Sequence, residues 1–427
     1  MLDIYHHPLR LRADPSRVVV RPFHLPPKPA NGAQSRSERI VEHVLSLDPP
    51  SVEAELHLVF KDFEARHWQT RKVFEARYAQ IEKDQGIDGK ALDQGQKELI
   101  GAYFCHEYSY AAAALMNPSV VCHPDQSGLR AGAVRILMSL RSVGEGHISS
   151  IAFREGIVSA NRDFELMPEP PFATAANSAV INHDRSDEAP ITVYRGEDST
   201  LSGTVLFPIT DAQRNGLEDL RLVTFTHPDG RREWLGTYTA YNGYAIRSEL
   251  LRTRDFKSFD LVPMAGSAAR NKGMALFPSA PDGVYRMIGR QDGENLFLIE
   301  SDDLETWGEG KLLMKPEHPW EFVQIGNCGS PIDLPEGWLV LTHGVGAMRK
   351  YAIGAALLDK KDPSKIIGRT RQPLLSAADE DREGYVPNVV YSCGGMAVGD
   401  DLFLPYGVAD SSVAFAFVSI NDLLSVM

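Results

Sequence analysis

The spacing of apolar residues changes abruptly near Asn117, and this change restricts the possible folds more than any other feature. From residue 37 to residue 115, apolar residues recur every three or four positions, as in SERIVEHVLSL and SVEAELHLVFKDF, which is typical of amphipathic helices. After Asn117, short runs rich in Val, Ile, Leu and Tyr alternate with turn signals such as Pro-Asp-Gly at 228–230, a pattern typical of strands. We predict a mainly helical N-terminal extension, residues 1–115, and an all-β domain, residues 116–427.

Five of the later runs resemble one another, because each is an apolar strand that ends in a polar residue or a glycine. They are VRILMSLR from Val134, REWLGTYTAY from Arg232, VYRMIGR from Val284, GWLVLTHG from Gly337 and DLFLPYG from Asp401. Repeated sheets whose inner strands deliver polar side chains to a central pocket are typical of β-propellers. A β-sandwich is the alternative.

The composition disfavours several classes of partner. The 57 Asp and Glu outnumber the 44 Lys and Arg, so we expect no general attraction to nucleic acid or to anionic membranes. The chain has neither a signal-peptide pattern at its start nor an apolar run of about 18 residues, and we expect a cytoplasmic protein. The cysteines have no CxxC spacing, so we expect no zinc or redox centre. They are Cys105, Cys122, Cys328 and Cys393.

The strongest local motif is NGLEDLR, which runs from Asn215 to Arg221 and leads into the strand RLVTFTH. Its two adjacent carboxylates, Glu218 and Asp219, lie next to an arginine. Such a group can hold a general acid whose pKa is tuned by its neighbours. An ordinary surface ion pair between Glu218 and Arg221 is the alternative.

GLEDLR resembles the Gly-x-Glu-Asp-Pro-Arg motif of glycoside hydrolase family 130, and five later motifs follow in the order of that family. These are RNKGMALFP from Arg270, SDDLETW from Ser301, GWLVLTHG from Gly337, GYVPN from Gly384 and YGVAD from Tyr406. The resemblance spans roughly residues 115–425. It implies a five-bladed β-propeller that cleaves β-mannosides from the chain end with inversion, with β-1,2-linked manno-oligosaccharides as neutral substrates.

The resemblance also implies roles for individual residues. The Asp of the family motif is the proton donor, which is Asp219 here. Leu220 stands where proline is usual, a difference that leaves Asp219 and Arg221 in place. Four residues match sugar-binding positions: Asn117, Arg141, Arg221 and Asp410. An ordinary turn at Asn117 and a structural cap at Asp410 are the alternatives.

Phosphorylases of the family use inorganic phosphate instead of water, which requires cationic and neutral donors opposite the acid. The residues that resemble this anion site are Arg270, Asn271, Arg290 and His343. Gln324 stands where a lysine is common. The loss of one charged hydrogen bond to an anion costs about 1.5–3 kcal/mol. We therefore expect hydrolysis, with a β-mannoside phosphorylase as the alternative and a non-catalytic sugar-binding propeller as a third hypothesis.

An inverting hydrolase needs a carboxylate that activates water about 6.5–9.5 Å from the acid. Glu145 and Glu321 are the candidates, and for each a sugar-binding or solvated carboxylate is the alternative. His147 and His343 have no third ligand at a recognisable spacing, so we expect no metal. We expect no cofactor, with phosphate as co-substrate only in a phosphorylase. The helical extension could cover one face of the propeller or form a homo-oligomer contact.

Overall fold

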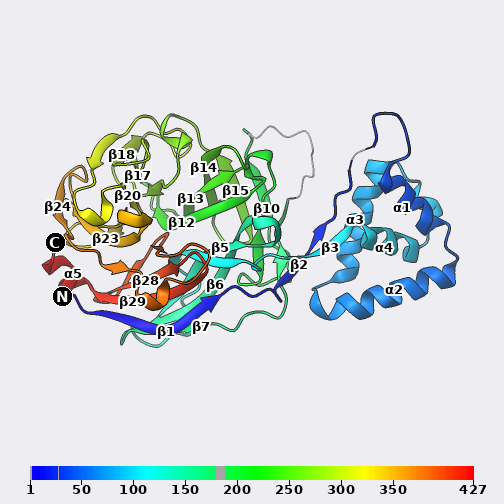
Figure 1. Cartoon of the computed structure of the whole chain (residues 1–427), viewed down its shortest axis with the longest axis horizontal. Coiled ribbons are helices and arrows are strands. Elements are labelled where there is room, and N and C mark those ends of the chain that lie inside the picture. Colours follow the sequence, from blue (N-terminus) through cyan, green and yellow to red (C-terminus); the bar gives the residue numbers. More distant parts are fainter. Residues whose placement is uncertain (1, 27, 179–187) are drawn as a thin grey trace. The chain divides into compact units, whose positions relative to one another are not determined.

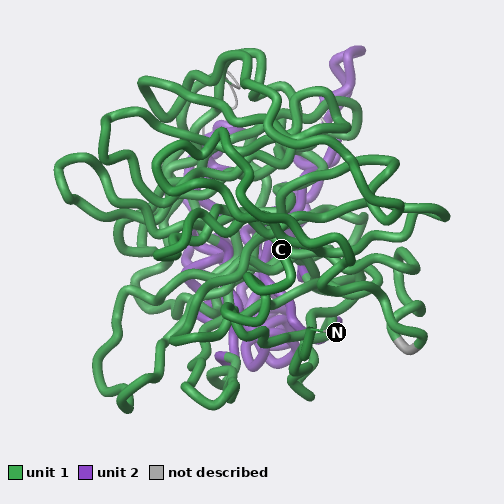
Figure 2. Tube along the Cα trace, turned by 90° about the vertical axis from the view of Figure 1, so that its left-hand side faces the viewer, with its two compact units in different colours: residues 1–14, 111–169, 176–427 green, residues 15–110, 170–175 purple. Residues whose placement is uncertain are grey.

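The computed structural model describes residues 2–26, 28–178 and 188–427 (Figure 1). The chain forms two compact units: residues 1–14, 111–169 and 176–427 form the β unit, and residues 15–110 and 170–175 form the helical unit (Figure 2). The first residues belong to the β unit because β1 (Ile4–Arg12) pairs with β29 (Ser412–Ser419) near the other end of the chain.

The helical unit contains four helices and a two-stranded ladder. Its elements are β2 (Val18–Pro22), α1 (Arg36–Leu45), α2 (Pro49–Phe63), α3 (Thr70–Gln85), α4 (Gln94–Tyr103) and β3 (Cys105–Ser109). Three of the helix starts carry a side-chain cap, from Ser35, Asp48 and Asp93. Such caps satisfy amide groups that have no partner within the helix. The helical periodicity therefore corresponds to helices up to Tyr103, but the helix expected to continue to residue 115 ends there, and Cys105–Ser109 form the strand β3.

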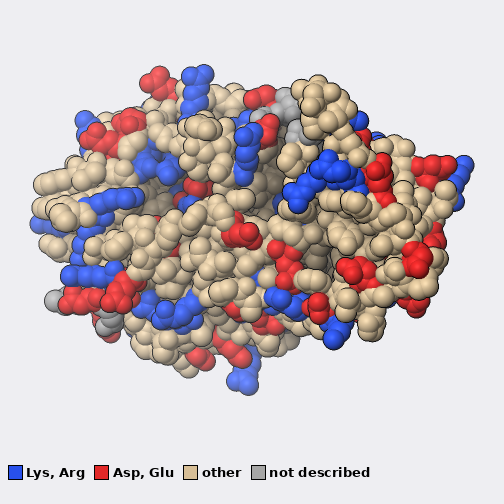
Figure 3. Space-filling model, turned by 45° about the vertical axis from the view of Figure 1, so that its right-hand side comes forward, with Lys and Arg blue, Asp and Glu red and all other residues tan. Residues whose placement is uncertain are grey.

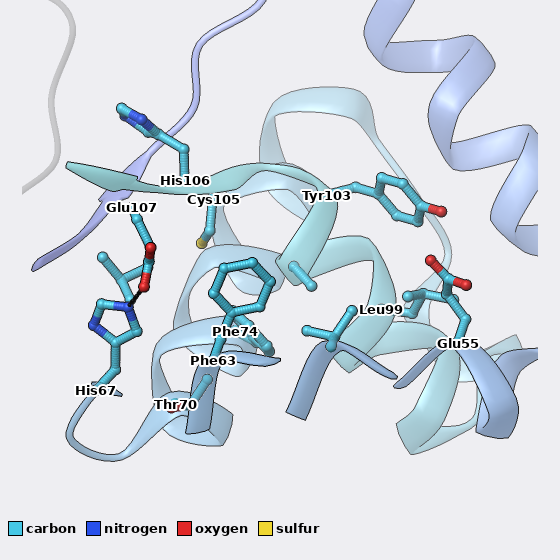
Figure 4. Close-up of a pocket in the computed structure, with 13 residues that line it drawn as sticks. Glu55, Phe63, His67, Thr70, Phe74, Leu99, Tyr103, Cys105, His106 and Glu107 are labelled. Carbon is cyan, nitrogen blue, oxygen red and sulfur yellow. Dashed lines mark hydrogen bonds and ion pairs between the residues drawn. The ribbon is translucent and has the colours of Figure 1, made fainter. Parts of the chain in front are cut away.

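The apolar faces of these helices share one core and line a small cavity of about 140 Å³ (Figure 4). Phe74 and Leu99 belong to both the core and the cavity wall. His67 Nε2 lies 2.6 Å from Glu107 Oε1 beside them (Figure 4). The helical unit thus has a core of its own, which is what an independent fold requires.

The described residues of the β unit include five groups of four antiparallel strands. The first has β4 (Ala114–Cys122), β5 (Val134–Val143), β6 (Ser149–Ser159) and β7 (Asp163–Leu166). The second has β12 (Gly216–Thr226), β13 (Arg232–Tyr241), β14 (Ile246–Thr253) and β15 (Ser258–Pro263). The third has β16 (Ala275–Leu276), β17 (Tyr285–Gly289), β18 (Leu296–Ser301) and β19 (Lys311–Met314).

The fourth group has β20 (Gln324–Asn327), β22 (Trp338–Val345), β23 (Tyr351–Leu358) and β24 (Ile366–Arg369). The fifth has β27 (Met396–Val398), β28 (Asp401–Val408), β29 and β1. The shorter elements are β8 (Thr174–Ala175), β9 (Asn177–Ser178), β10 (Ile191–Tyr194), β11 (Thr204–Leu206), β21 (Ile332–Asp333), β25 (Leu375–Ser376), β26 (Val390–Tyr391) and α5 (Ile420–Ser425). The five runs singled out in the sequence are confirmed as strands, and each is the second strand of its group.

Five apolar cores connect the groups in cyclic order. The paired residues are Leu137 and Leu217 between the first and second groups, Phe225 and Met287 between the second and third, Ile288 and Val340 between the third and fourth, Leu341 and Leu404 between the fourth and fifth, and Phe403 and Met138 between the fifth and first. Each fully buried side chain of this kind contributes about 1.5–3 kcal/mol. The fifth core contains residues of both the fifth and the first group, so the order of the cores returns to the first group.

In the part of the chain that the structure describes, no helix is both long and apolar enough to cross a membrane. On the face drawn in Figure 3, Lys and Arg side chains are interspersed with Asp and Glu side chains. A face with both signs of charge does not create the single-sign field that attracts polyanions over a distance.

Candidate active site

A cavity of about 270 Å³ in the β unit is lined by side chains from all five strand groups. Its carboxylates are Glu218, Asp219 and Asp410, and its cations are Arg141, Arg221, Lys272, Arg290 and Arg349. Asn117, Gln324, Asn327, His343, Tyr351 and Tyr391 add neutral polar groups. Polar groups that converge on one cavity are typical of a ligand site.

Two β-bulges direct Asn117 and Asp219 towards each other. The register of β4 on β5 shifts between Met116 and Ser119, and that of β12 on β13 shifts between Glu218 and Arg221. Inside these bulges Asn117 has a φ of 49° and Asp219 a φ of 56°, a conformation that costs about 1–3 kcal/mol for a residue other than glycine. Asn117 Nδ2 donates a 2.7 Å hydrogen bond to Asp219 Oδ1. Bulges of this kind re-aim side chains next to active sites.

Arg141 connects the two adjacent carboxylates. Its Nη2 donates to Glu218 Oε1 at 2.6 Å, and its Nη1 donates to Asp219 Oδ1 at 3.3 Å. Its Nε donates to Ser149 Oγ at 2.9 Å, which fixes the plane of the guanidinium. The sequence alternative, an ion pair between Glu218 and Arg221 on the surface, does not fit because Arg221 is buried and donates to the Tyr391 hydroxyl at 2.7 Å.

The three carboxyl groups experience different electrostatic environments. Burial alone would raise the pKa of Asp219, but the charges of Arg141 and Arg221 outweigh it and hold the pKa below its ordinary value. Lys272 acts in the same direction. Burial raises the pKa of Glu218 more than Arg141 lowers it. Asp219 is therefore an ionised carboxylate at neutral pH in the free protein.

Asp410 lies in the turn between β28 and β29, with a φ of 49°. Burial raises its pKa to about 6, and the negative charge of Asp219 contributes to the rise. Arg141 and Arg349 oppose it. Asp410 therefore holds a proton under mildly acidic conditions, close to a carboxylate that does not.

Another part of the cavity has polar groups without protein partners. Among the described residues, Arg290 Nε and Nη1, Arg221 Nε and His343 Nδ1 are buried and have no hydrogen-bond partner. Both polar atoms of the Asn327 side chain share this property. Burial, together with the charges of Arg290 and Arg221, holds the pKa of His343 well below its ordinary value, so its imidazole is neutral. Cationic and neutral donors in this arrangement can bind an anion.

Lys272 is a cavity residue that sequence reasoning missed. Its loop is held by Asn271, whose Nδ2 donates to the carbonyl of Gln291 at 3.1 Å and whose Oδ1 accepts from the amide of Lys272 at 2.8 Å. Within RNKG, the arginine and asparagine drew attention because they match the family pattern. The positive charge of the lysine that follows them in the same motif was the signal that could have identified Lys272 as a cavity residue.

The structure brings seven of the predicted site residues to the cavity. They are Asn117, Arg141, Asp219, Arg221, Arg290, His343 and Asp410. The cavity wall does not include Arg270, whose side chain is exposed, or Asn271, which holds the loop. It adds Glu218, Lys272, Gln324, Asn327, Arg349, Tyr351 and Tyr391.

Neither predicted base is part of the described cavity wall. Glu321 is fully buried elsewhere. Its Oε1 accepts from the amides of Glu317 and His318 at 2.9 and 2.8 Å and from Arg369 Nη2 at 2.7 Å. It therefore caps a turn and balances an arginine. Glu145 lies exposed in the turn between β5 and β6, outside that wall.

The chain is similar in sequence to known enzymes that act on mannosides. A family model described as β-1,4-mannooligosaccharide phosphorylase, glycoside hydrolase family 130, matches residues 192–427. The chain is 37% identical over 231 residues to a 1,2-β-oligomannan phosphorylase of Thermoanaerobacter sp. (strain X514), covering 52% of this chain and 75% of the relative. It is 30% identical over 227 residues to a β-1,2-mannobiose phosphorylase of Listeria innocua, covering 51% of this chain and 62% of the relative.

The fold is similar to that of a solved structure described as "The GH130 family of mannoside phosphorylases contains glycoside hydrolases that target beta-1,2 mannosidic linkages in Candida mannan". The TM-score is 0.52 at 21% sequence identity, over 74% of this chain and 87% of that chain. At this identity the likeness establishes the fold alone.

Proposed function

Because this chain belongs to glycoside hydrolase family 130 and is thus an enzyme that cleaves β-mannosides, we propose that it does so by phosphorolysis and releases mannose 1-phosphate. This proposal replaces the expectation of hydrolysis. Both relatives described above are phosphorylases. The expectation of hydrolysis depended on one residue, Gln324, which has no positive charge. Other cations of the cavity can replace that charge, so this residue no longer argues against phosphate binding.

The observation that supports phosphorolysis is the set of cations around Gln324. Lys272, Arg290 and Arg349 line the same cavity as Gln324. A positive charge absent at position 324 is thus supplied from the loop before β16. Five cationic side chains face three carboxylates in this cavity. Such an excess of positive charge suits a dianion better than a water molecule.

The proposed mechanism assigns one part of the cavity to each reactant. Phosphate, bound near Arg290, His343 and Lys272, attacks the anomeric carbon, and the glycosidic C–O bond breaks on the opposite side. The leaving oxygen receives a proton that originates from Asp219, and the product is an α-mannosyl phosphate because the attack inverts the configuration. Phosphate is already nucleophilic, so no carboxylate is needed to activate it. Glu145 and Glu321 therefore have no part in this mechanism.

The terminal mannose is proposed to bind between the acid and the groups that surround it. Asn117, Arg141 and Asp410 present amide, guanidinium and carboxyl groups to the cavity. These groups can donate to and accept from sugar hydroxyls. The relatives' activities support β-1,2-linked manno-oligosaccharides as the substrate class.

We further propose that the five strand groups are the blades of a five-bladed β-propeller. Two observations support this arrangement: the five cores link the groups in a cycle, and residues from every group line one cavity. The pairing of β1 with β29 would then complete the fifth blade with the first strand of the chain, which avoids an open edge between the ends of the cycle.

The test is to incubate the protein with β-1,2-mannobiose in the presence and absence of inorganic phosphate, and to follow sugar phosphates by ³¹P NMR. Mannose 1-phosphate should form only with phosphate, and as the α-anomer. Release of free mannose at a rate that does not depend on phosphate would refute phosphorolysis and restore the hydrolase.

A further inference from the structure

Two turns in different strand groups have almost the same backbone. Between β5 and β6, Gly144 has φ −100° and ψ −163°, and Gly146 has φ 69° and ψ 14°. Between β22 and β23, Gly346 has φ −103° and ψ −162°, and Met348 has φ 57° and ψ 26°. In both turns the first glycine donates to a carbonyl four residues later. Met348 therefore occupies the place that a glycine occupies in the matching turn.

This methionine is in an unfavourable position for its residue type. The left-handed conformation suits glycine, whereas a side chain with a Cβ is strained there. Met348 is also 93% exposed, so burial within the chain does not compensate for the strain. Residues held in such conformations are often found at binding sites.

Met348 belongs to an apolar surface that we call the rim patch, which consists of Phe322, Val323 and Met348. Phe322 is 62% exposed and Val323 is 60% exposed. The two segments lie together, because the amide of Val323 donates to the carbonyl of Val345 at 2.9 Å. Exposed apolar residues on two hydrogen-bonded segments differ from the single ones that are common on protein surfaces.

The two segments of the rim patch lead directly into residues of the cavity wall. The residue after Val323 is Gln324 and the residue after Met348 is Arg349, and both of these line the cavity. A cavity of about 270 Å³ is smaller than the roughly 300–1,000 Å³ that holds a drug-sized ligand. With phosphate and one sugar inside, the remaining units of an oligosaccharide must lie outside, beside the residues at its rim.

We propose that the rim patch binds sugar units of longer β-linked manno-oligosaccharides that lie outside the cavity, through the apolar C–H faces of these units. The inference rests on the proposed function, because it needs a mannose unit bound in the cavity. It makes Phe322 and Met348 determinants of chain-length preference. A glycine at this position would relieve the backbone strain, but it would provide no side chain to contact the sugar. The strain at Met348 is therefore the cost of an apolar side chain at this position.

The experiment compares kcat/KM for a β-1,2-linked disaccharide and tetrasaccharide in the wild type and in Met348→Gly, Met348→Leu and Phe322→Ala. Glycine suits the backbone of this turn, so Met348→Gly should unfold at the same or a higher temperature than the wild type. Its kcat/KM for the tetrasaccharide should fall about fivefold, the effect of roughly 40 Å² of apolar surface that is no longer buried. The value for the disaccharide, which places a single unit outside the cavity, should fall less. Met348→Leu should retain most of the preference.

Ile367→Ala is the matched control, because Ile367 is 52% exposed on β24 and has no part in the rim patch. Equal changes for both substrates, or no change for either, would overturn the proposal. So would a change in the molar mass of Met348→Gly in solution without a change in chain-length preference, because the patch would then be a contact between copies. If the wild type forms no mannose 1-phosphate, the proposed function fails. Calorimetric titration of the wild type and Met348→Gly with the two saccharides then tests the rim patch separately. A weaker affinity of Met348→Gly for the tetrasaccharide supports the rim patch, and equal affinities refute it.

Discussion

Replacement of Lys272 by glutamine should weaken phosphate binding specifically. Lys272 lines the cavity together with Arg290 and His343, and its charge helps to hold the pKa of Asp219 below its ordinary value. A hydrogen bond from a charged group contributes about 1.5–3 kcal/mol, so its loss should raise the KM for phosphate roughly 10- to 150-fold. The KM for the disaccharide should change little, because sugar hydroxyls are neutral.

Gln324 provides the reciprocal variant, because it faces the same cavity without a charge. The double variant Lys272→Gln with Gln324→Lys restores the number of positive charges and should recover a large part of the affinity for phosphate. Lys311→Gln is the control, because it removes the same charge from β19 in the same strand group, away from the described cavity wall. Initial rates of mannose 1-phosphate formation over a range of phosphate concentrations measure the effect. A KM for phosphate within threefold of the wild type in Lys272→Gln would refute the assignment of Lys272 to the anion site.

Three further outcomes are expected. Asp219→Asn should lower kcat by about 10²- to 10⁴-fold with the mannose affinity nearly unchanged, because only proton transfer is lost; steady-state kinetics with near-wild-type turnover would contradict this. Asp410 has a pKa of about 6, above the unfolded value, so the folded state binds its proton more tightly and stability should fall as pH rises from about 4 to 6. Thermal unfolding should show that Asp410→Asn reduces this fall, and an unchanged pH dependence would be inconsistent with the raised pKa. Glu145→Gln should retain phosphorolysis. Glu321→Gln should lower the unfolding temperature, because it leaves Arg369 without its buried charged partner. A fully folded Glu145→Gln without turnover would support Glu145 as the catalytic base.

Local patterns in the sequence were sufficient to predict most helices and strands and some of the residues that line the cavity. Helical spacing and strand runs depend on neighbours a few residues apart, and the five repeated runs are real strands. The motif around Asp219 also belongs to a strand that brings this residue to the cavity wall. These successes share one cause, which is that each feature is encoded within one strand or turn.

Features that depend on distant residues were not accessible in this way. The first strand was grouped with the helical extension, whereas Ile4 pairs with Val418. Glu321 resembles a free carboxylate until Arg369, a residue of β24, is found beside it. The direction of Lys272 depends on a hydrogen bond between Asn271 and Gln291. In each case the decisive partner lies far along the chain or depends on how a loop is held, and no periodicity reports it.

In the proposed mechanism, bound phosphate prepares its own acid. The charges of Arg141, Arg221 and Lys272 outweigh the effect of burial and keep Asp219 ionised in the free protein, yet an acid must carry a proton. A negative charge placed about 6 Å away shifts a pKa upward by about two units at an effective dielectric constant of about 20. A bound dianion near Lys272 should therefore raise the pKa of Asp219 and favour its protonation. Sulfate is a suitable probe because it carries two charges and does not react.

Calorimetric titration with sulfate at a pH of about 6.5, in buffers that differ in ionisation enthalpy, measures this proton uptake. Asp410→Asn should still take up protons when sulfate binds, whereas Asp219→Asn should take up fewer protons than the wild type. If the uptake persists in Asp219→Asn and disappears in Asp410→Asn, then Asp410 is the group that responds to the anion. The supply of the proton would then have to be reassigned to the carboxyl group whose pKa is already close to neutral.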